Sequence, residues 1–216
     1  MLFYLSMNIP QVNELISKGI KVIDPQTTYI DKSVKITGKG IEIHPNTFIK
    51  GETEINDNCT IGPNSFLNNA KIDRNVKITF SHVEDSHVED NCTIGPYSRI
   101  RNNSEIGKNV TIGNFAEIKA STIGENSRIN HYSYLGDAFL GTNVNIGAGT
   151  ITCNYDGEKK NRTSIGDNSF IGAGTMLIAP IKIGKNAKTG AGSVVTKNVN
   201  DFVTVVGNPA KILDNA

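Results

Sequence analysis

The sequence predicts an all-β protein built as a parallel β-helix. Three observations favour this fold class: an aliphatic residue recurs at every sixth position over most of the chain, a smaller residue stands two positions before it, and glycine often follows it. A six-residue period matches neither the 3.6-residue turn of an α-helix nor the alternation of a simple strand. Sustained over a long stretch, it is typical of short strands that coil and stack.

The repeat is clearest between residues 94 and 118. Its aliphatic positions are Ile94, Ile100, Ile106, Ile112 and Ile118. The positions two before them hold Cys92, Ser98, Ser104, Val110 and Ala116, and glycine follows at Gly95, Gly107 and Gly113. We expect the aliphatic side chains to fill the interior of the coil, the smaller ones to fit its corners, and glycine to relieve backbone strain at the turns.

The same period extends in both directions. Upstream it includes Ile43, Ile49, Ile55, Ile61 and Leu67, and downstream Ile123, Ile129, Leu135, Leu140, Ile146, Ile165, Ile171, Leu177, Ile183 and Val195. Three hexads form one triangular turn of about eighteen residues, and neighbouring turns stack at roughly 4.7–4.9 Å. Residues 28–199 therefore form about nine coils.

The segments before and after the repeat have other patterns. Residues 1–27 are predicted to form an arm and linker, with a short helix over residues 8–19 that Asn8 caps and that carries Pro10 in its first turn. The apolar face of this helix is formed by Val12, Leu15 and Ile16. Residues 200–216 lack the repeat, and we expect them to cap the exposed strand edge at that end of the coil.

One polar interruption divides the repeat at residues 152–164, which read TCNYDGEKKNRTS. Asp156 and Gly157 predict a turn within it, and the hexads resume on its far side. A rigid coil that puts out a single polar loop favours a functional role for the loop, and a tolerated surface insertion is the alternative.

Composition narrows the function classes. The 216 residues suffice for one well-buried domain, and a net charge of +1 argues against nucleic acid or an anionic membrane as a partner. Cys59 and Cys92 occupy the small-residue position and are interpreted as packing residues, while the role of Cys153 stays open. The apolar run at the N-terminus is too short for a signal peptide, so we expect a cytoplasmic protein.

Two cations are predicted to stack on neighbouring coils. Arg101 and Lys119 each follow a hexad isoleucine and stand eighteen residues apart, which is one full turn. Like charges at that spacing repel unless an anion lies between them, so the pair is a candidate clamp for a phosphate or carboxylate. Alternatively, both side chains splay into water.

His131 is the candidate general base. It lies two residues beyond the hexad residue Ile129, so its side chain is expected to project outward at a corner, where a neutral imidazole can take a proton near pH 7. Counting one turn onward places Ala148 above it. A surface histidine without a chemical role is the alternative.

The residues 131–138, His-Tyr-Ser-Tyr-Leu-Gly-Asp-Ala, and the residues 143–157 carry a more specific signal. Together they resemble the acetyltransferase domains of the bifunctional GlmU enzymes, within the hexapeptide-repeat acyltransferases. The likeness runs from about residue 23 to Val195. It implies a left-handed β-helix, a homotrimer with sites between subunits, and transfer of an acetyl group from acetyl-CoA to the amine of glucosamine 1-phosphate without a metal.

The resemblance also implies residue roles. His131 takes the place of the general base, and the weaker expectation is that Glu117 orients its imidazole. The phosphosugar is bound by Arg101, Lys119, Tyr134, Asn145 and Lys160. The acetyl-CoA site is lined by Ala148, Asn154, Tyr155, Ala173 and Ala191, with Lys211 in place of a C-terminal arginine of the family. The oxyanion is expected to meet backbone N–H groups or the side chains of Asn154 and Tyr155.

Two departures from the family leave alternatives open: the tail near Asn208 lacks the family's arginine, and one domain of the family is missing. The nucleotidyltransferase domain of the family has no counterpart in this sequence, so we expect no uridyltransferase activity, and a separate uridyltransferase is a compatible partner. The acceptor can be another amino-sugar phosphate. Rival interpretations are a non-catalytic scaffold and a zinc protein similar to the γ-class carbonic anhydrases, with His82, His87 and His44 as ligands.

Overall fold

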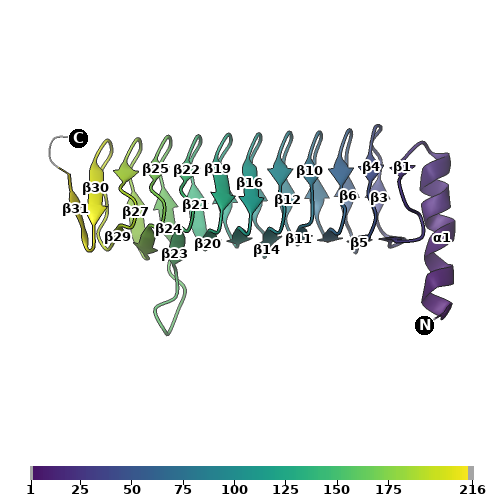
Figure 1. Ribbon diagram of the computed structural model, residues 1–216, viewed down its shortest axis with the longest axis horizontal. Helices are drawn as coiled ribbons and strands as arrows, with labels where there is room; N and C mark the ends of the chain where they lie inside the picture. Colours follow the sequence, from purple (N-terminus) through teal and green to yellow (C-terminus); the bar gives the residue numbers. More distant parts are fainter. Residues whose placement is uncertain (1, 214–216) are drawn as a thin grey trace.

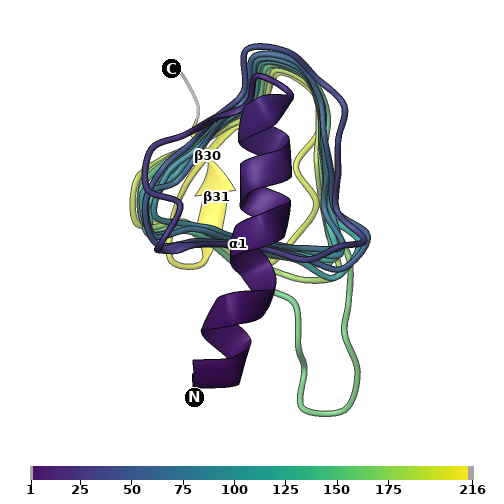
Figure 2. The ribbon, with the colours of Figure 1, turned by 90° about the vertical axis from the view of Figure 1, so that its right-hand side faces the viewer.

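The computed structural model describes residues 2–213, with side chains from residue 10 onward. It shows an elongated prism, a stack of coils (Figure 1) that are triangular when viewed along the stack (Figure 2). The predicted parallel β-helix is confirmed. It has about ten turns, compared with about nine predicted. The difference arises at the ends, because strand β1 (Lys21–Val22) precedes the predicted start of the repeat and β30 (Thr204–Gly207) follows its predicted end.

Three sheets form the sides of the prism. Sheet A consists of β1, β4 (Glu42–Ile43), β7 (Thr60–Ile61), β10 (Lys77–Ile78), β13 (Thr93–Ile94), β16 (Thr111–Asn114), β19 (Arg128–His131), β22 (Asn145–Ile146), β25 (Phe170–Ile171), β28 (Lys188–Thr189), β30 and β31 (Ala210–Ile212). Sheet B consists of β2 (Thr28–Ile30), β5 (Thr47–Lys50), β8 (Phe66–Asn68), β11 (His82–Glu84), β14 (Arg99–Arg101), β17 (Glu117–Lys119), β20 (Tyr134–Gly136), β23 (Ile151–Cys153), β26 (Met176–Ile178) and β29 (Val194–Val195). Sheet C consists of β3 (Lys35–Ile36), β6 (Glu54–Ile55), β9 (Lys71–Ile72), β12 (His87–Val88), β15 (Glu105–Ile106), β18 (Thr122–Ile123), β21 (Ala138–Leu140), β24 (Thr163–Ile165) and β27 (Ile181–Ile183).

The interior of the prism is a continuous stack of aliphatic side chains. Ile100 pairs with Ile118, and Ile118 pairs with Leu135, so one buried side chain sits directly on the next along sheet B. The small positions contribute buried hydroxyls that bond to the backbone. Ser121 Oγ, for example, donates to the carbonyl oxygen of Lys119 at 2.8 Å. The hexad therefore places aliphatic side chains inside the coil, and the buried hydroxyl groups of its small residues form hydrogen bonds with the backbone.

Asparagine, more than glycine, makes the tight corners of the coil. Asn75, Asn91 and Asn109 have positive φ angles of 59°, 61° and 58°. Their amides also form ladders between coils, as in the 3.0 Å bond from Asn75 Nδ2 to Asn91 Oδ1. Gly113 has a different role from the one predicted, because a Cβ there would collide with the backbone of Asn130 on the next coil. It permits close packing of coils rather than an unusual φ.

Helix α1 (Leu2–Ser17) lies across the N-terminal end of the prism (Figure 2). Val12 and Leu15 are buried as predicted, whereas Ile16 is 40% exposed. The prediction for Asn8 and Pro10 was wrong, since the helix begins at Leu2 and both residues lie inside it. Leucine and methionine before them favour the helical conformation, which extends it beyond the expected cap.

The C-terminal end is covered by the hairpin of β30 and β31, which pair antiparallel. The hairpin lies within the segment predicted to cap the coil, of which residues 214–216 lie outside the described residues. Cys59 and Cys92 are buried, and burial raises the pKa of their thiols to about 11 and about 12, as expected of packing residues. Helix α1 is too short and too polar to cross a bilayer, and no other helix is present among residues 2–213.

Candidate active site

A group of cations gathers at the end of the middle strands of sheet B. Arg101 ends β14 and Lys119 ends β17, and the two residues are register partners on adjacent coils, as the eighteen-residue spacing predicted. The guanidinium of Arg101 is held by Glu117, whose Oε1 lies 2.7 Å from Nε. Lys119 is only 8% exposed. A lysine buried to that degree is costly unless an anion accompanies it.

Lys119 has a carboxylate and another cation beside it. Asp137 Oδ2 lies 3.9 Å from Nζ of Lys119 and accepts a 2.5 Å hydrogen bond from Nδ2 of Asn154. The positive charge of the nearby Lys119 ammonium lowers the pKa of Lys160. Three cations and two carboxylates, Glu117 and Asp137, leave one net positive charge at this place, which suits an anionic group such as a phosphate.

The polar loop brings Lys160 to the group. It leaves the coil after β23 and returns at β24, projecting from one corner of the prism (Figures 1 and 2). Tyr155 and Lys160 form an antiparallel bridge across it. Asp156 accepts the N–H groups of Glu158 and Lys159 at 2.9 and 2.8 Å, which lowers the pKa of its carboxyl to about 2. The loop is therefore an internally bonded hairpin.

Tyr134 begins β20 on the same sheet and lies one coil above Glu117. Its phenol extends over Gly136, where a Cβ would collide with the tyrosine hydroxyl and with the amide of Asn154. Glycine at position 136 thus lets Tyr134 and Asn154 lie close to the cations. The structure brings together five of the predicted residues: Arg101, Lys119, Tyr134, Asn154 and Lys160.

His131 lies at the corner where each coil passes from sheet A to sheet B, which we name the A–B corner. Its Nδ1 is 2.6 Å from Oδ1 of Asn114, the residue below it on the preceding coil. Because an amide oxygen only accepts hydrogen bonds, Nδ1 is the donor in this contact, and in the neutral ring Nε2 is then the nitrogen with a free lone pair. Within the chain, the carboxylate of Glu117 holds Arg101 and Asn114 contacts the imidazole, while a role for Glu117 in orienting His131 stays a prediction.

The alanines predicted to line the acetyl-CoA site stack on successive coils above His131. Gly149 donates its N–H to the carbonyl of His131 at 3.1 Å, Gly174 to that of Ala148 at 2.7 Å, and Gly192 to that of Ala173 at 2.7 Å. These bonds stack Ala148, Ala173 and Ala191 in register above His131 along the A–B corner. All three alanines are exposed, so a ligand has access to this strip of small residues.

Asn145 and Lys211 lie apart from these groups within the chain, and Tyr155 lies on the loop opposite Lys160. Asn145 is on sheet A, paired with Arg128. Lys211 is on the terminal strand β31, opposite Val206. Tyr155 is 61% exposed on the loop, with its hydroxyl bonded to the carbonyl of Gly157.

The histidines of the zinc interpretation do not converge in the chain. His82 is on sheet B, His87 is on sheet C, and His44 follows β4 on sheet A. His87 lies between Asp73 and Glu105, at 2.9 and 3.2 Å. Within residues 2–213 no group of three His, Cys, Asp or Glu side chains is arranged to hold a metal.

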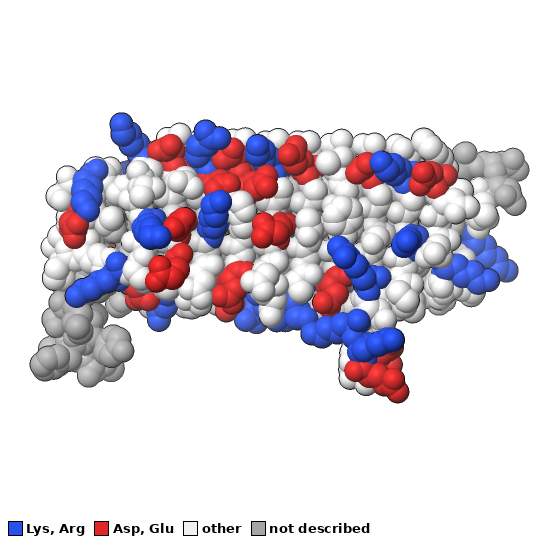
Figure 3. All heavy atoms as spheres, turned by 180° about the vertical axis from the view of Figure 1, so that it is seen from behind, with Lys and Arg blue, Asp and Glu red and all other residues white. Residues whose placement is uncertain are grey.

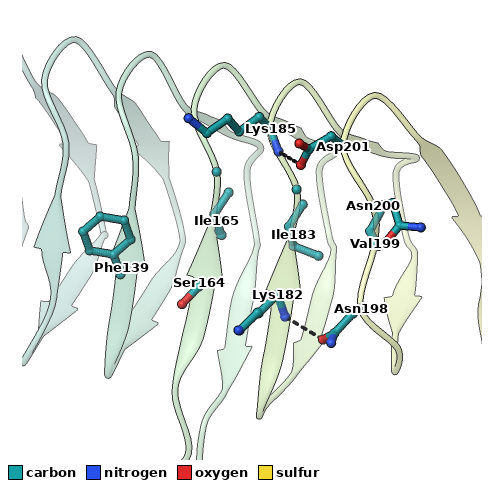
Figure 4. A pocket seen from close by; sticks show the side chains of 12 residues that line it. Phe139, Ser164, Ile165, Lys182, Ile183, Lys185, Asn198, Val199, Asn200 and Asp201 are labelled. Carbon is teal, nitrogen blue, oxygen red and sulfur yellow. Dashed lines mark hydrogen bonds between the residues drawn. The ribbon is translucent and has the colours of Figure 1, made fainter.

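Other surfaces differ in character from these groups. Acidic and basic side chains alternate over much of the face in Figure 3, and basic side chains gather along the edge from which the loop projects. A cavity of about 670 Å³ lies on sheet C near the C-terminal end, with Lys182 and Lys185 at its wall (Figure 4). There Lys182 N–H donates to Asn198 Oδ1 at 2.9 Å. The residues that line this cavity include none of the predicted site residues.

Asn114, Gly136 and Asp137 were not singled out from the sequence. Asn114 precedes His131 by seventeen residues, so counting back one coil would have found it. Asp137 follows the corner of the coil, where the direction of a side chain depends on the local turn. Its contacts with Lys119 and Asn154 become visible only in the folded chain.

Two family models match the chain. The model of the GMPPB C-terminal domain matches residues 82–176, and the model of the bacterial transferase hexapeptide, with six repeats, matches residues 162–197. Both matches agree with the hexad period seen in the coil.

The curated relatives include the bifunctional protein GlmU of Thermotoga petrophila, which is 48% identical over 207 residues, covering 96% of this chain and 46% of the relative. The GlmU protein of Thermosipho melanesiensis is 54% identical over 203 residues, covering 94% of this chain and 45% of the relative. The chain thus spans about half the length of the curated relatives it matches.

Solved structures with the same coil include a perosamine N-acetyltransferase from Caulobacter crescentus in complex with CoA and GDP-perosamine, with a TM-score of 0.52 and 27% identity over 57% of each chain. A UDP-N-acetylglucosamine acyltransferase from Campylobacter jejuni has a TM-score of 0.63 at 19% identity, over 89% of this chain and 74% of the other, and shares the fold alone. The chain therefore belongs to the hexapeptide-repeat proteins, and within them it is a homologue of the acetyltransferase region of GlmU.

Proposed function

We propose that the chain transfers the acetyl group of acetyl-CoA to the amine of glucosamine 1-phosphate, giving N-acetylglucosamine 1-phosphate and CoA. The observation that carries this proposal is the cation group, in which Arg101 and Lys160 lie near the nearly buried ammonium of Lys119. A phosphate bound there would neutralise the excess positive charge. Homology to GlmU supports an amino sugar as the rest of the acceptor.

The chemistry needs a base for the attacking amine. His131 offers Nε2 as a proton acceptor, with Nδ1–H held by Asn114. The amine attacks the thioester carbonyl and loses a proton to the imidazole, the tetrahedral intermediate collapses, and the imidazolium returns the proton to the departing thiolate of CoA. Asn154 and Tyr155 are the proposed donors to the oxyanion.

We further propose that the working assembly is a homotrimer. The loop projects away from its own coil beyond the bridge between Tyr155 and Lys160, and Asn145 lies on a different sheet from the cations. Both observations favour a site completed by a neighbouring copy. The exposed strip of Ala148, Ala173 and Ala191 would then form one wall of a groove for acetyl-CoA.

The test is an acetyl-CoA consumption assay with three acceptors: glucosamine 1-phosphate, glucosamine 6-phosphate and a nucleotide-linked amino sugar. We expect the highest kcat/KM with glucosamine 1-phosphate. A preference for the nucleotide-linked sugar would indicate that the natural acceptor is a nucleotide-linked amino sugar, like the GDP-perosamine bound by the perosamine enzyme. No acetyl transfer to any acceptor would overturn the proposed function.

A further inference from the structure

An aromatic ladder occupies the A–B corner below the level of His131. Phe80, Tyr97, Phe115 and Tyr132 contact one another in sequence, with ring centroids 5.5, 5.3 and 4.9 Å apart. Tyr132, the last ring, directly follows His131 and is 63% exposed. The ladder therefore ends beside the imidazole.

Above Tyr132 the same position of the corner holds glycine. Tyr132 donates its N–H to the carbonyl of Asn114, and the equivalent donors on the next coils are Gly149, Gly174 and Gly192. All of these positions have left-handed backbone, with φ of 48° at Tyr132 and 74°, 69° and 70° at the three glycines. Along the A–B corner, aromatic side chains up to Tyr132 are therefore followed, from the next coil onward, by glycines without side chains.

Neither packing nor backbone conformation requires glycine at these three positions. A Cβ on Gly149 or Gly174 would meet the next glycine at an ordinary 3.7 Å, and a Cβ on Gly192 would have nothing within 4 Å. Left-handed backbone costs free energy for residues with a Cβ, yet Tyr132 and Phe115 adopt it in the same column. The glycines therefore keep the surface clear, and Tyr132 closes the cleared strip at its lower end.

Resting on the proposed function, we propose that Tyr132 sets the length of the acyl group that the enzyme transfers. The thioester arm of acetyl-CoA would lie along Ala148, Ala173 and Ala191, so its carbonyl reaches the level of His131 from above. Carbons beyond the acetyl methyl would continue in the same direction and meet the ring of Tyr132. Because the rings of Phe115 and Tyr97 occupy the next two coils below Tyr132, its ring cannot fold down to make room.

The test compares acetyl-CoA, propionyl-CoA and butyryl-CoA as donors to glucosamine 1-phosphate in the Tyr132→Gly variant. Glycine suits the left-handed backbone at this position, so the fold should be retained. We expect the ratio of kcat/KM for acetyl-CoA to that for butyryl-CoA to fall at least about tenfold, the usual scale for methylene discrimination in a pocket. Tyr132→Asn, matching Asn64 in the same column with φ of 50°, provides a second variant.

The matched control is Tyr97→Gly, which removes a ladder ring two coils lower from the same left-handed conformation. It should keep the donor preference of the wild type. An unchanged donor ratio in active Tyr132→Gly and Tyr132→Asn proteins would overturn the inference, as would equal relaxation in the control. Failure of the proposed function would be seen separately, as a wild-type protein that transfers no acetyl group.

Discussion

At the scale of the residue, the contact between His131 and Asn114 decides which ring nitrogen is available for catalysis. We expect His131→Ala to lower kcat by about 10²- to 10⁴-fold, the usual range for loss of a general base. The KM values should change little, because the imidazole acts on the amine after binding. Steady-state kinetics with both substrates measure this, and an unaltered kcat would remove His131 from the mechanism.

Lys119 is the residue whose role depends most on its surroundings, since it is nearly buried between a carboxylate and a second ammonium. Replacing it with alanine should raise the KM for glucosamine 1-phosphate by about 10- to 100-fold, the scale of a charge-assisted hydrogen bond of about 1.5–3 kcal/mol. The KM for acetyl-CoA should stay within about twofold of the wild-type value if its site is independent.

The matched control for Lys119→Ala is Lys182→Ala, which removes a lysine from the separate cavity on sheet C. Its KM for the phosphosugar should equal that of the wild type. A similar rise in both variants would show that overall charge, rather than the local cation group, controls binding.

At the scale of the element, the loop hairpin gives a pH dependence. The adjacent Lys119 ammonium lowers the pKa of Lys160, so Lys160 loses its proton at a lower pH than an ordinary lysine does. The cation that binds phosphate is thus present at neutral pH and is lost as pH rises. The KM for glucosamine 1-phosphate should increase through the alkaline range, beginning below the usual lysine pKa of about 10.4.

This prediction is checked by measuring that KM from about pH 7 to about pH 10 in the wild type and in Lys160→Arg, whose guanidinium stays charged throughout. The rise should be smaller in the arginine variant. Equal profiles would assign the alkaline effect to another group.

The coil itself is an element whose stability rests on its interior stack. Ile112 is fully buried, and truncating it in Ile112→Ala should lower the free energy of unfolding by about 2–5 kcal/mol. Ile178→Ala, at a position that is 38% exposed, should cost clearly less. Denaturant unfolding measures both, and similar costs would argue against the interior as the main source of stability.

At the scale of the whole molecule, a site shared between copies can be tested by complementation. His131→Ala and Lys160→Ala chains, each of low activity alone, should regain activity when co-expressed if one site draws these residues from different copies. Co-expressed His131→Ala and Asn114→Ala chains should show no such gain, because these two side chains touch within one chain. Absence of recovery in the first pair would place the site within a single copy.

Much of the architecture was predictable because a hexad period determines the side of the triangular coil on which each residue lies. Counting hexads predicted the buried isoleucines, the stacking of Arg101 on Lys119 and the place of Ala148 above His131. It failed for Gly113, whose role depends on the backbone of the next coil, and for helix α1, which has no period that marks its start.

The sequence by itself determined the parallel β-helix, the position of the polar loop and the types of side chain available for chemistry. Only the tertiary structure decided that Asn114 contacts the imidazole, that Asp137 lies between Lys119 and Asn154, and that Lys160 of the loop lies near Lys119. The physical reason is that a repeat specifies position along and around the coil. The direction of a side chain at a corner, and the docking of a loop, depend on contacts between coils that a local period does not encode.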